Sequence, residues 1–413
     1  MSDVIAAGPA AAPAPVKGRS RRRGAVVMLV GGYANNLLLV VQGLVLVPLY
    51  LRHLGPETYG GWMASGDLLG WLAVLDMGIA GISVQRMAAA HGRGEHRSVG
   101  DYFGTGLAVQ GLLVALLTVL AVLASPFVPA WVRLEGAAGT ELAACFAVAG
   151  VATGLGLLGN VVTGLALSTQ RMVFVNLAIF AAGVAQIAVT LVLLGQGRGL
   201  WALALGMLAR TGLVLALAGA HAAYVLRHDL GVRARVRREV VRELGGLSTV
   251  SVLVMLGNTL VGRSDAMLIA LFHGPQTVTL YVLTRRAAEM LAMFLARIGG
   301  AVSPGFAHLV GSGERARAAA VMGQVGRLYF CAAVPALALY MALNRSFVEL
   351  WVGPGHFAGQ GLTVLVGLNV LLVGWAALVL SMSGAAGLIA RAGMALFVEA
   401  VVRVGLALLL LRA

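Results

Sequence analysis

The sequence contains few charged residues. Only 11% of its 413 residues are Asp, Glu, Lys or Arg, whereas soluble domains carry about 25%. A soluble enzyme of this length is therefore excluded. A disordered scaffold is excluded as well, because such chains are poor in apolar residues and this one is rich in them.

Cysteine is also scarce. Cys145 and Cys331 lie in apolar segments, and neither has a second Cys or a His at metal-ligand spacing. The sequence also contains no Gly-x-Ser-x-Gly elbow and no phosphate-binding Gly-Lys-Ser/Thr loop. We therefore expect no disulfide framework, no metal, no cofactor and no catalytic residue. Any active transport must draw on an ion gradient or on the gradient of the substrate itself.

Apolar residues make up 60% of the chain, and its mean hydropathy is +0.91. These values are typical of an all-α, polytopic membrane protein, in which each crossing takes roughly 20 residues. Hydropathy predicts eleven spans, at about 26–50, 58–82, 103–125, 142–167, 173–194, 200–225, 246–272, 278–301, 322–343, 360–384 and 393–411.

The basic residues predict the orientation of these spans, because cytoplasmic loops collect Lys and Arg. With the amino terminus in the cytoplasm, the inside segments hold 19 basic residues, and the outside segments hold 5. The outside residues are Arg52, Arg133, Arg198, Arg345 and Arg412. This bias predicts a cytoplasmic amino terminus and an outside carboxyl terminus. It also accounts for most of the net charge of +14 without a nucleic-acid partner.

Short motifs recur along the chain at an offset of 219 or 220 residues. His53–Thr58 (HLGPET) recurs as Phe272–Thr277 (FHGPQT), and Gly92–Glu95 (GRGE) recurs as Gly311–Glu314 (GSGE). Phe127 and Trp131 recur as Phe347 and Trp351, and Arg171 recurs as Arg391. Four matches in chain order at one offset indicate a duplication.

The duplication predicts a disordered basic cytoplasmic tail over 1–23, a six-helix lobe over 24–230, a basic cytoplasmic connector over 231–242 and a second lobe over 243–413. Six spans per unit give both lobes the same orientation, so a pseudo-two-fold axis along the membrane normal should relate them. The second lobe would hold five helices, since nothing corresponds to the sixth span. We expect either a natural chain one helix shorter than the duplication requires or a truncated form.

Charged residues occur inside the predicted spans, where each costs about 2.5–3.5 kcal/mol at mid-bilayer. Such residues usually face a cavity or the interior of a bundle. Arg286, Glu289 and Arg297 share one face of the eighth span, with Arg285 four residues before Glu289. Ser251, Asn258 and Asp265 form a polar stripe at spacing 7 in the seventh span, near Arg263. The first span has a similar stripe in Asn35 and Gln42, with Asn36 beside it.

These residues predict a cationic cavity between the lobes. Arg263, Arg285, Arg286 and Arg297 outnumber Asp265 and Glu289, and unpaired buried cations favour an anionic ligand. Arginine suits phosphate through its bidentate donors and permanent charge, so a phosphate or pyrophosphate substrate is expected. We include Asn35, Asn36 and Asn258 in the predicted binding site. Structural ion pairs and snorkelling to the interface are the alternative explanation for each charge.

Asp76 and Glu289 are candidates for proton or ion coupling. Asp76 closes the second span just before Gly78. The simpler reading of Asp76 is a residue that caps or positions the following loop. Arg403, four residues after Glu399, is expected to form a local ion pair.

The stretch VPLYLRHLGPETYG, Val47–Gly60, and the stretch LDMGI, Leu75–Ile79, resemble the signatures of bacterial polysaccharide transporters. These are the oligosaccharide, or O-antigen, flippases of the multidrug/oligosaccharidyl-lipid/polysaccharide exporter superfamily. The likeness extends over about 26–411. It implies two helical lobes and alternating access in the bacterial inner membrane. The implied activity is outward flipping of an undecaprenyl-pyrophosphate-linked sugar for cell-surface polysaccharide such as lipopolysaccharide.

The same resemblance implies membrane lipids and the lipid-linked oligosaccharide as partners, together with a polysaccharide polymerase and glycosyltransferases. Two alternatives stay open. A multidrug cation/proton antiporter of the same superfamily would need acidic cavity residues, and the first span has none. A non-transporting membrane partner of a glycan-assembly complex would tolerate the loss of the cavity arginines.

Overall fold

The computed structural model describes residues 18–387 and 389–412, and this part of the chain is helical without strands. The elements are α1 Gly18–Leu72, η1 Ala73–Asp76, α2 Ile79–Gly92, α3 His96–Ala124, η2 Ser125–Phe127, α4 Val128–Trp131, α5 Gly136–Ser168, α6 Met172–Gly195, α7 Trp201–Tyr224, η3 Val225–Asp229, α8 Arg238–Gly262, α9 Asp265–His273, α10 Pro275–Gly311, α11 Arg315–Val352, α12 Gln360–Ala385 and α13 Ile389–Arg412.

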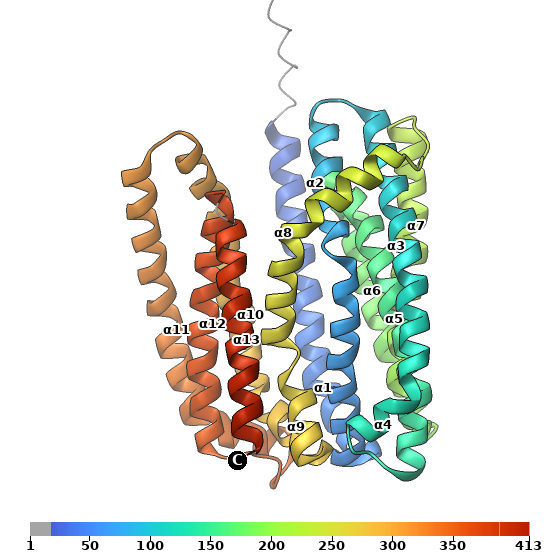
Figure 1. The fold of residues 1–413 in the computed structure, drawn as a ribbon, viewed down its shortest axis with the longest axis vertical. Helices are drawn as coiled ribbons and strands as arrows, with labels where there is room; N and C mark the ends of the chain where they lie inside the picture. The colour runs from blue at the N-terminus through green and yellow to red at the C-terminus, as the bar shows by residue number, and fades with distance from the viewer. Residues whose placement is uncertain (1–17, 388, 413) are drawn as a thin grey trace, which may run out of the picture.

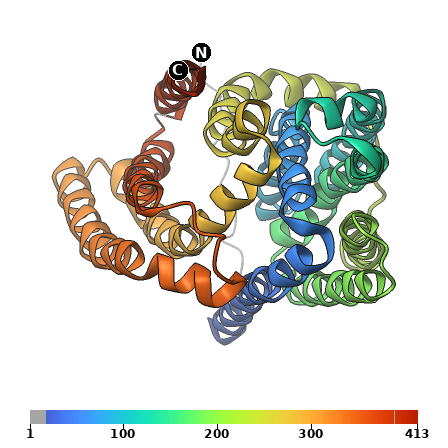
Figure 2. The same ribbon diagram turned by 90° about the horizontal axis from the view of Figure 1, so that it is seen from below.

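The helices form two lobes. Helices α1 to α7 gather on one side of the molecule and α10 to α13 on the other, with α8 and α9 between them (Figures 1 and 2). The predicted all-α fold with two helical lobes is confirmed. The start of α1 and the end of α13 lie at opposite ends of the bundle (Figure 1).

Helix α1 contains two predicted spans. Gly55 interrupts it with φ 78 and ψ 163, a backbone region open essentially to glycine alone. The chain reverses there, so the segment before Gly55 and the segment after it cross the bundle in opposite directions (Figure 1). A second break, at Met77 and Gly78 with φ 48 and 75, separates η1 from α2.

Each of the eleven predicted spans has a helical counterpart. Eight helices are long and apolar enough to cross a membrane, and the pair α8 and α9, bent by 43°, would make a ninth. The first of the eight is α1, which holds two spans. Helix α10 is not among them, and charged residues such as Arg285 and Glu289 interrupt its apolar sequence.

The backbone repeats at the offset of the sequence motifs. Gly55 (φ 78, ψ 163) matches Gly274 (φ 83, ψ 167), and Gly94 (φ 73) matches Gly313 (φ 77). The side chains repeat as well, because Phe127 stacks on Trp131 with the rings 6.4 Å apart and Phe347 stacks on Trp351 at 5.5 Å. The described second lobe has no counterpart of α7.

Two predicted boundaries differ from the helices. Helix α1 begins at Gly18, inside the predicted tail, and residues 1–17 of that tail lie outside the described residues. Helix α8 begins at Arg238, so the last part of the predicted connector is helical. Val240 and Leu244 near its start pack on Ile79 and Ile82 of α2.

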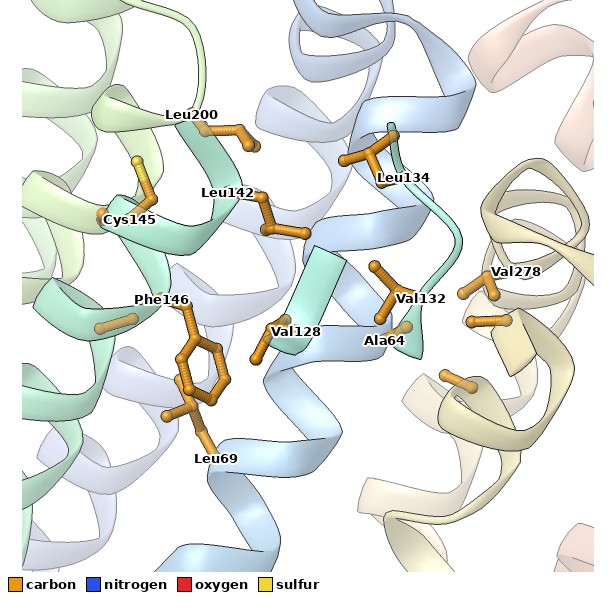
Figure 3. Close-up of a cluster of buried hydrophobic side chains, with 14 of the residues drawn as sticks. Ala64, Leu69, Val128, Val132, Leu134, Leu142, Cys145, Phe146, Leu200 and Val278 are labelled. Atoms are coloured by element: carbon orange, nitrogen blue, oxygen red, sulfur yellow. The ribbon is translucent and has the colours of Figure 1, made fainter. Parts of the chain in front are cut away.

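The two lobes share a core at one end of the bundle. This end holds Gly55, α4 and Gly274, and we call it the seam end. The other end, which holds the α2–α3 connection and residues 227–242, we call the arginine-rich end. At the seam end Phe146 and Leu142 of the first lobe belong to the same buried cluster as Val278 of α10 (Figure 3).

Candidate functional site

A network of ion pairs joins three helices of the second lobe. Asp265, at the start of α9, accepts from Nη2 of Arg403 on α13 at 3.0 Å and lies 3.5 Å from Nη1 of Arg285 on α10. The Tyr281 hydroxyl donates to Asp265 at 2.6 Å and accepts from Arg285 at 2.7 Å. Asp265 therefore fixes α9, α10 and α13 to one another.

Glu289 connects this network to the first lobe. It accepts from Nε of Arg285 at 2.8 Å and from Nη1 of Arg286 at 3.3 Å, one helical turn away on α10. The Arg286 guanidinium reaches α1 at Gly43, where a Cβ would overlap it. A residue without a side chain at position 43 therefore lets Arg286 lie against α1.

Arg263 lies at the break between α8 and α9 and makes a second contact between the lobes. It lies 3.9 Å from Asp67 of α1, and its carbonyl accepts from Trp71 Nε1 at 3.1 Å. Its aliphatic carbons lie beside Gly70, where a Cβ would be 3.0 Å away. Arg263 is the most exposed member of these pairs, with 57% of its side chain accessible.

A cavity of about 370 Å³ lies between α1, α7 and α10. We call it the central cavity. Arg286 and Glu289 line it, as do Gln42 of α1 and Arg210 of α7. Among the described residues Arg210 has no ion-pair partner, and the buried Gln42 Oε1 and Arg286 Nε have no hydrogen-bond partner. The cavity therefore presents unused polar groups inside an apolar bundle.

The charges around the lobe interface leave an excess of cations. Five arginines (Arg210, Arg263, Arg285, Arg286 and Arg403) lie near three carboxylates (Asp67, Asp265 and Glu289). The formal sum of these eight residues is +2. Such an interface can stabilise an anionic group, because its attraction to cations held in place repays part of the desolvation cost of the ligand.

The structure gathers Arg263, Asp265, Arg285, Arg286 and Glu289 of the predicted set into this interface. Arg297 lies about 12 Å further along α10 than Glu289, at 1.5 Å per residue, and faces the Tyr33 ring at 5.7 Å. Asn258 donates to Val254 O of its own helix and is exposed.

Asn35 lies away from this interface. Its amide donates to Asn176 O on α6 at 3.2 Å, so it contacts the inside of the first lobe. Asn36 is half-buried and has no hydrogen-bond partner in the described part of the chain.

Asp76 is buried at the break between η1 and α2. Its Oδ1 accepts from Gln110 of α3 and from the Ala80 N–H at 3.4 Å, at the start of α2. These bonds fit the simpler prediction, a residue that positions the following helix. Asp76 nevertheless has no arginine partner among the described residues.

Sequence reasoning missed some members of the interface. The expected local pair of Arg403 with Glu399 is wrong, since Arg403 binds Asp265 across 138 residues, a contact that no local spacing reveals. Asp67 and Tyr281 did carry signals. Asp67 precedes Arg286 by the repeat offset of 219, and Tyr281 precedes Arg285 by one helical turn.

A family model described as "Polysaccharide biosynthesis protein" matches residues 22–310, more than half of the chain. No curated protein matches the chain by sequence. Among solved structures, an inward-facing multidrug resistance MATE family transporter of the MOP superfamily is similar over 92% of this chain and 88% of its own, with a TM-score of 0.71 and 14% identity. An outward-facing structure of such a transporter covers 95% and 88%, with a TM-score of 0.69 and 13% identity.

Proposed function

Because the chain belongs to the polysaccharide biosynthesis protein family, we propose that it is a flippase for a polyprenyl-pyrophosphate-linked oligosaccharide. It would act in the bacterial inner membrane by alternating access, in the synthesis of a cell-surface polysaccharide. The observation that carries this proposal is the excess of arginine around the central cavity.

The chemistry of the pyrophosphate matches these groups. Arg210 has no ion-pair partner in the described chain, and the Arg286 Nε–H has no acceptor. A guanidinium offers paired donors to phosphate oxygens and keeps its charge at every physiological pH. Gln42 on the facing helix α1 adds an acceptor, its Oε1, which has no partner among the described residues and suits a sugar hydroxyl and not a phosphate. The substrate phosphates would provide the acceptors that the protein lacks here.

Contacts at the seam end fit one closed state of an alternating-access cycle. Thr279 of α10 donates to Pro56 O at 2.5 Å, and Gly60 lies against Pro275 O so closely that a Cβ would overlap it. Pro56 and Pro275 are equivalent in the repeat, as are Gly60 and Thr279, so the two lobes meet through related surfaces. Trp351 also donates to Leu44 O at 2.7 Å. To release substrate at this end, the lobes must separate along this seam.

Native mass spectrometry of the full chain purified from its own membranes tests the proposal. Wild-type protein should retain a polyprenyl-pyrophosphate glycan, whose mass identifies the sugar. Arg210→Gln/Arg286→Gln should lose it, and Arg198→Gln/Arg345→Gln, which removes the same charge from two exposed seam-end positions, should keep it. Retention of bulk phospholipid alone by wild type would contradict the proposal.

A cation/proton antiporter is the second candidate, and Asp76 is the observation that favours it. Asp67, Asp265 and Glu289 each bind an arginine, so an antiported cation would have to displace a guanidinium. Asp76 binds Gln110 and backbone N–H groups, and it has no arginine partner in the described part of the chain. If Asp76 couples transport to protons, Asp76→Asn should remove the dependence on a pH gradient. Organic-cation transport that persists in Arg210→Gln/Arg286→Gln would favour the antiporter.

A non-transporting partner of a polymerase or a glycosyltransferase predicts the opposite result for the arginines. If the protein is such a partner, cells carrying Arg210→Gln/Arg286→Gln should make as much surface polysaccharide as wild-type cells. If it is a flippase, the same cells should lose the polysaccharide.

A further inference from the structure

A second and larger cavity lies in the first lobe, outside the central cavity. Its volume is about 1170 Å³, slightly more than the roughly 300–1,000 Å³ of typical ligand pockets. Its walls come from α3, α5, α7 and the connector that follows η3. We call it the lateral groove. Helices α3 and α7 each pack on α5, and the three lie together at one side of the molecule (Figure 1).

The membrane-spanning part of the lateral groove is apolar. Leu107 of α3, Leu158 of α5 and Leu215 of α7 line it, and Gly219 leaves room between them because nothing lies within 4 Å of where its Cβ would stand. Such a surface binds hydrocarbon and offers no partner to a sugar or to a free anion.

The connector forms the wall of the groove at the arginine-rich end. It is held firmly on α3, because Arg235 N–H donates to Gly100 O at 3.3 Å and Arg237 N–H donates to the Thr105 hydroxyl at 3.0 Å. Gly104 permits this approach, since a Cβ there would lie 2.5 Å from the Arg235 nitrogen. The last turn of the preceding helix is widened, with Leu230 N–H bonded to Val225 O five residues back.

Two arginines stand where the apolar groove meets the connector. Arg227 and Arg233 line its mouth and are exposed. Three carboxylates of this end bind other arginines: Asp229 binds Arg171, Asp101 binds Arg237, and Glu243 binds Arg86. In the described part of the chain Arg227 and Arg233 have no carboxylate partner. The groove therefore combines an apolar channel with two free cations at one end.

We propose that the lateral groove binds one anionic phospholipid of the leaflet at the arginine-rich end. Its acyl chains lie between α3 and α7, and its phosphate lies at Arg227 and Arg233. The charge favours an anionic lipid over a zwitterionic one, because each basic residue near an anionic headgroup contributes about 1 kcal/mol, close to a fivefold change in affinity. The bound lipid would stabilise the position of the connector that joins the two lobes. The proposal is independent of the flippase activity.

Native mass spectrometry with added phosphatidylglycerol or phosphatidylethanolamine of matched acyl chains tests the site on the full chain. We expect one phosphatidylglycerol to bind preferentially. Arg227→Gln/Arg233→Gln should weaken it about 25-fold, from two contributions of about fivefold each. Arg235→Gln/Arg238→Gln, which removes the same charge from exposed positions that do not line the groove, should change it little.

A second pair of variants tests the apolar part without changing charge. Gly219→Leu fills the groove and should reduce binding strongly, whereas Gly212→Leu, also on α7 but outside the groove, should not. Equal binding of the two lipids, equal loss in the arginine variant and its control, or a polyprenyl glycan as the bound mass would each overturn the proposal.

Discussion

At the scale of single residues, a glycine in α1 allows Arg286 to occupy its position in the central cavity. Gly43 lies where the Arg286 guanidinium meets α1. Gly43→Ala should therefore displace Arg286 from the central cavity. The helix itself should not suffer, because alanine is the better helix former by about 0.5–1 kcal/mol. Glycan binding and transport should fall toward the level of Arg286→Gln.

Gly32→Ala is the matched control, since Gly32 is on the same helix and nothing lies within 4 Å of its Cβ position. Binding by native mass spectrometry and thermal unfolding in detergent should be compared for both variants. Full glycan binding by Gly43→Ala would show that the placement of Arg286 is irrelevant.

Asp265 should be the residue of the ion-pair network with the largest effect on stability. Asp265→Asn leaves Arg403 without its carboxylate. Breaking a fully buried pair costs about 3–5 kcal/mol, and these side chains are about a quarter exposed, so we expect a loss of about 2–4 kcal/mol. Unfolding followed by tryptophan fluorescence measures it. The double variant with Arg403→Gln should lose less than the sum of the single variants, and strict additivity would argue against a direct pair.

Residue types and spacing predicted part of this site. Arg285 and Glu289 pair as their helical spacing indicates, and five predicted residues meet at the lobe interface. The polar stripe of the first span predicted that Asn35 and Gln42 face the cavity, but only Gln42 lines it, whereas Asn35 contacts α6. A stripe read from a single sequence does not fix the rotation of a helix about its axis. The positions of Arg403 and Arg210 at the interface follow from tertiary packing, which cannot be inferred from a single sequence.

At the scale of elements, the duplication predicts that the same substitution at equivalent helix breaks of the two lobes has the same effect on stability. Gly55 and Gly274 share a backbone conformation that costs other residues about 1–3 kcal/mol. Gly55→Ala and Gly274→Ala should therefore each destabilise the protein by a similar amount within that range. Thermal unfolding should show no comparable loss for Gly66→Ala, whose position has free space and no positive φ. A large loss in only one lobe would contradict structural equivalence.

The elements themselves were largely predictable, because apolar runs and breaking motifs are local signals. The motif HLGPET at His53–Thr58 marked the reversal in α1, and its repeat marked the start of α10 at Pro275. Each lobe also contains a second helix break, and the sequence did not predict that these breaks occur in different spans of the two lobes. The first lobe breaks its second span at Met77, whereas the second lobe breaks its first span at Arg263.

At the scale of the whole molecule, the seam between the lobes should control access. Gly60→Val places a side chain against the Pro275 carbonyl and should hold the seam end open. Spin labels at Arg52→Cys and Gln276→Cys, both exposed, in a Cys331→Ser background, should report a longer distance than in the Gly60 parent. Gly66→Val should leave it unchanged. An unaltered distance in Gly60→Val would mean that this contact does not close the molecule.

The most direct test of the flippase account is a translocation assay. Proteoliposomes are loaded with a polyprenyl-pyrophosphate-linked oligosaccharide, and its accessibility to an external glycosidase is followed with and without a pH gradient. Wild type and Arg198→Gln/Arg345→Gln should transfer the glycan between leaflets, and Arg210→Gln/Arg286→Gln should not. Transfer by wild type no faster than in protein-free vesicles under either condition would contradict the account.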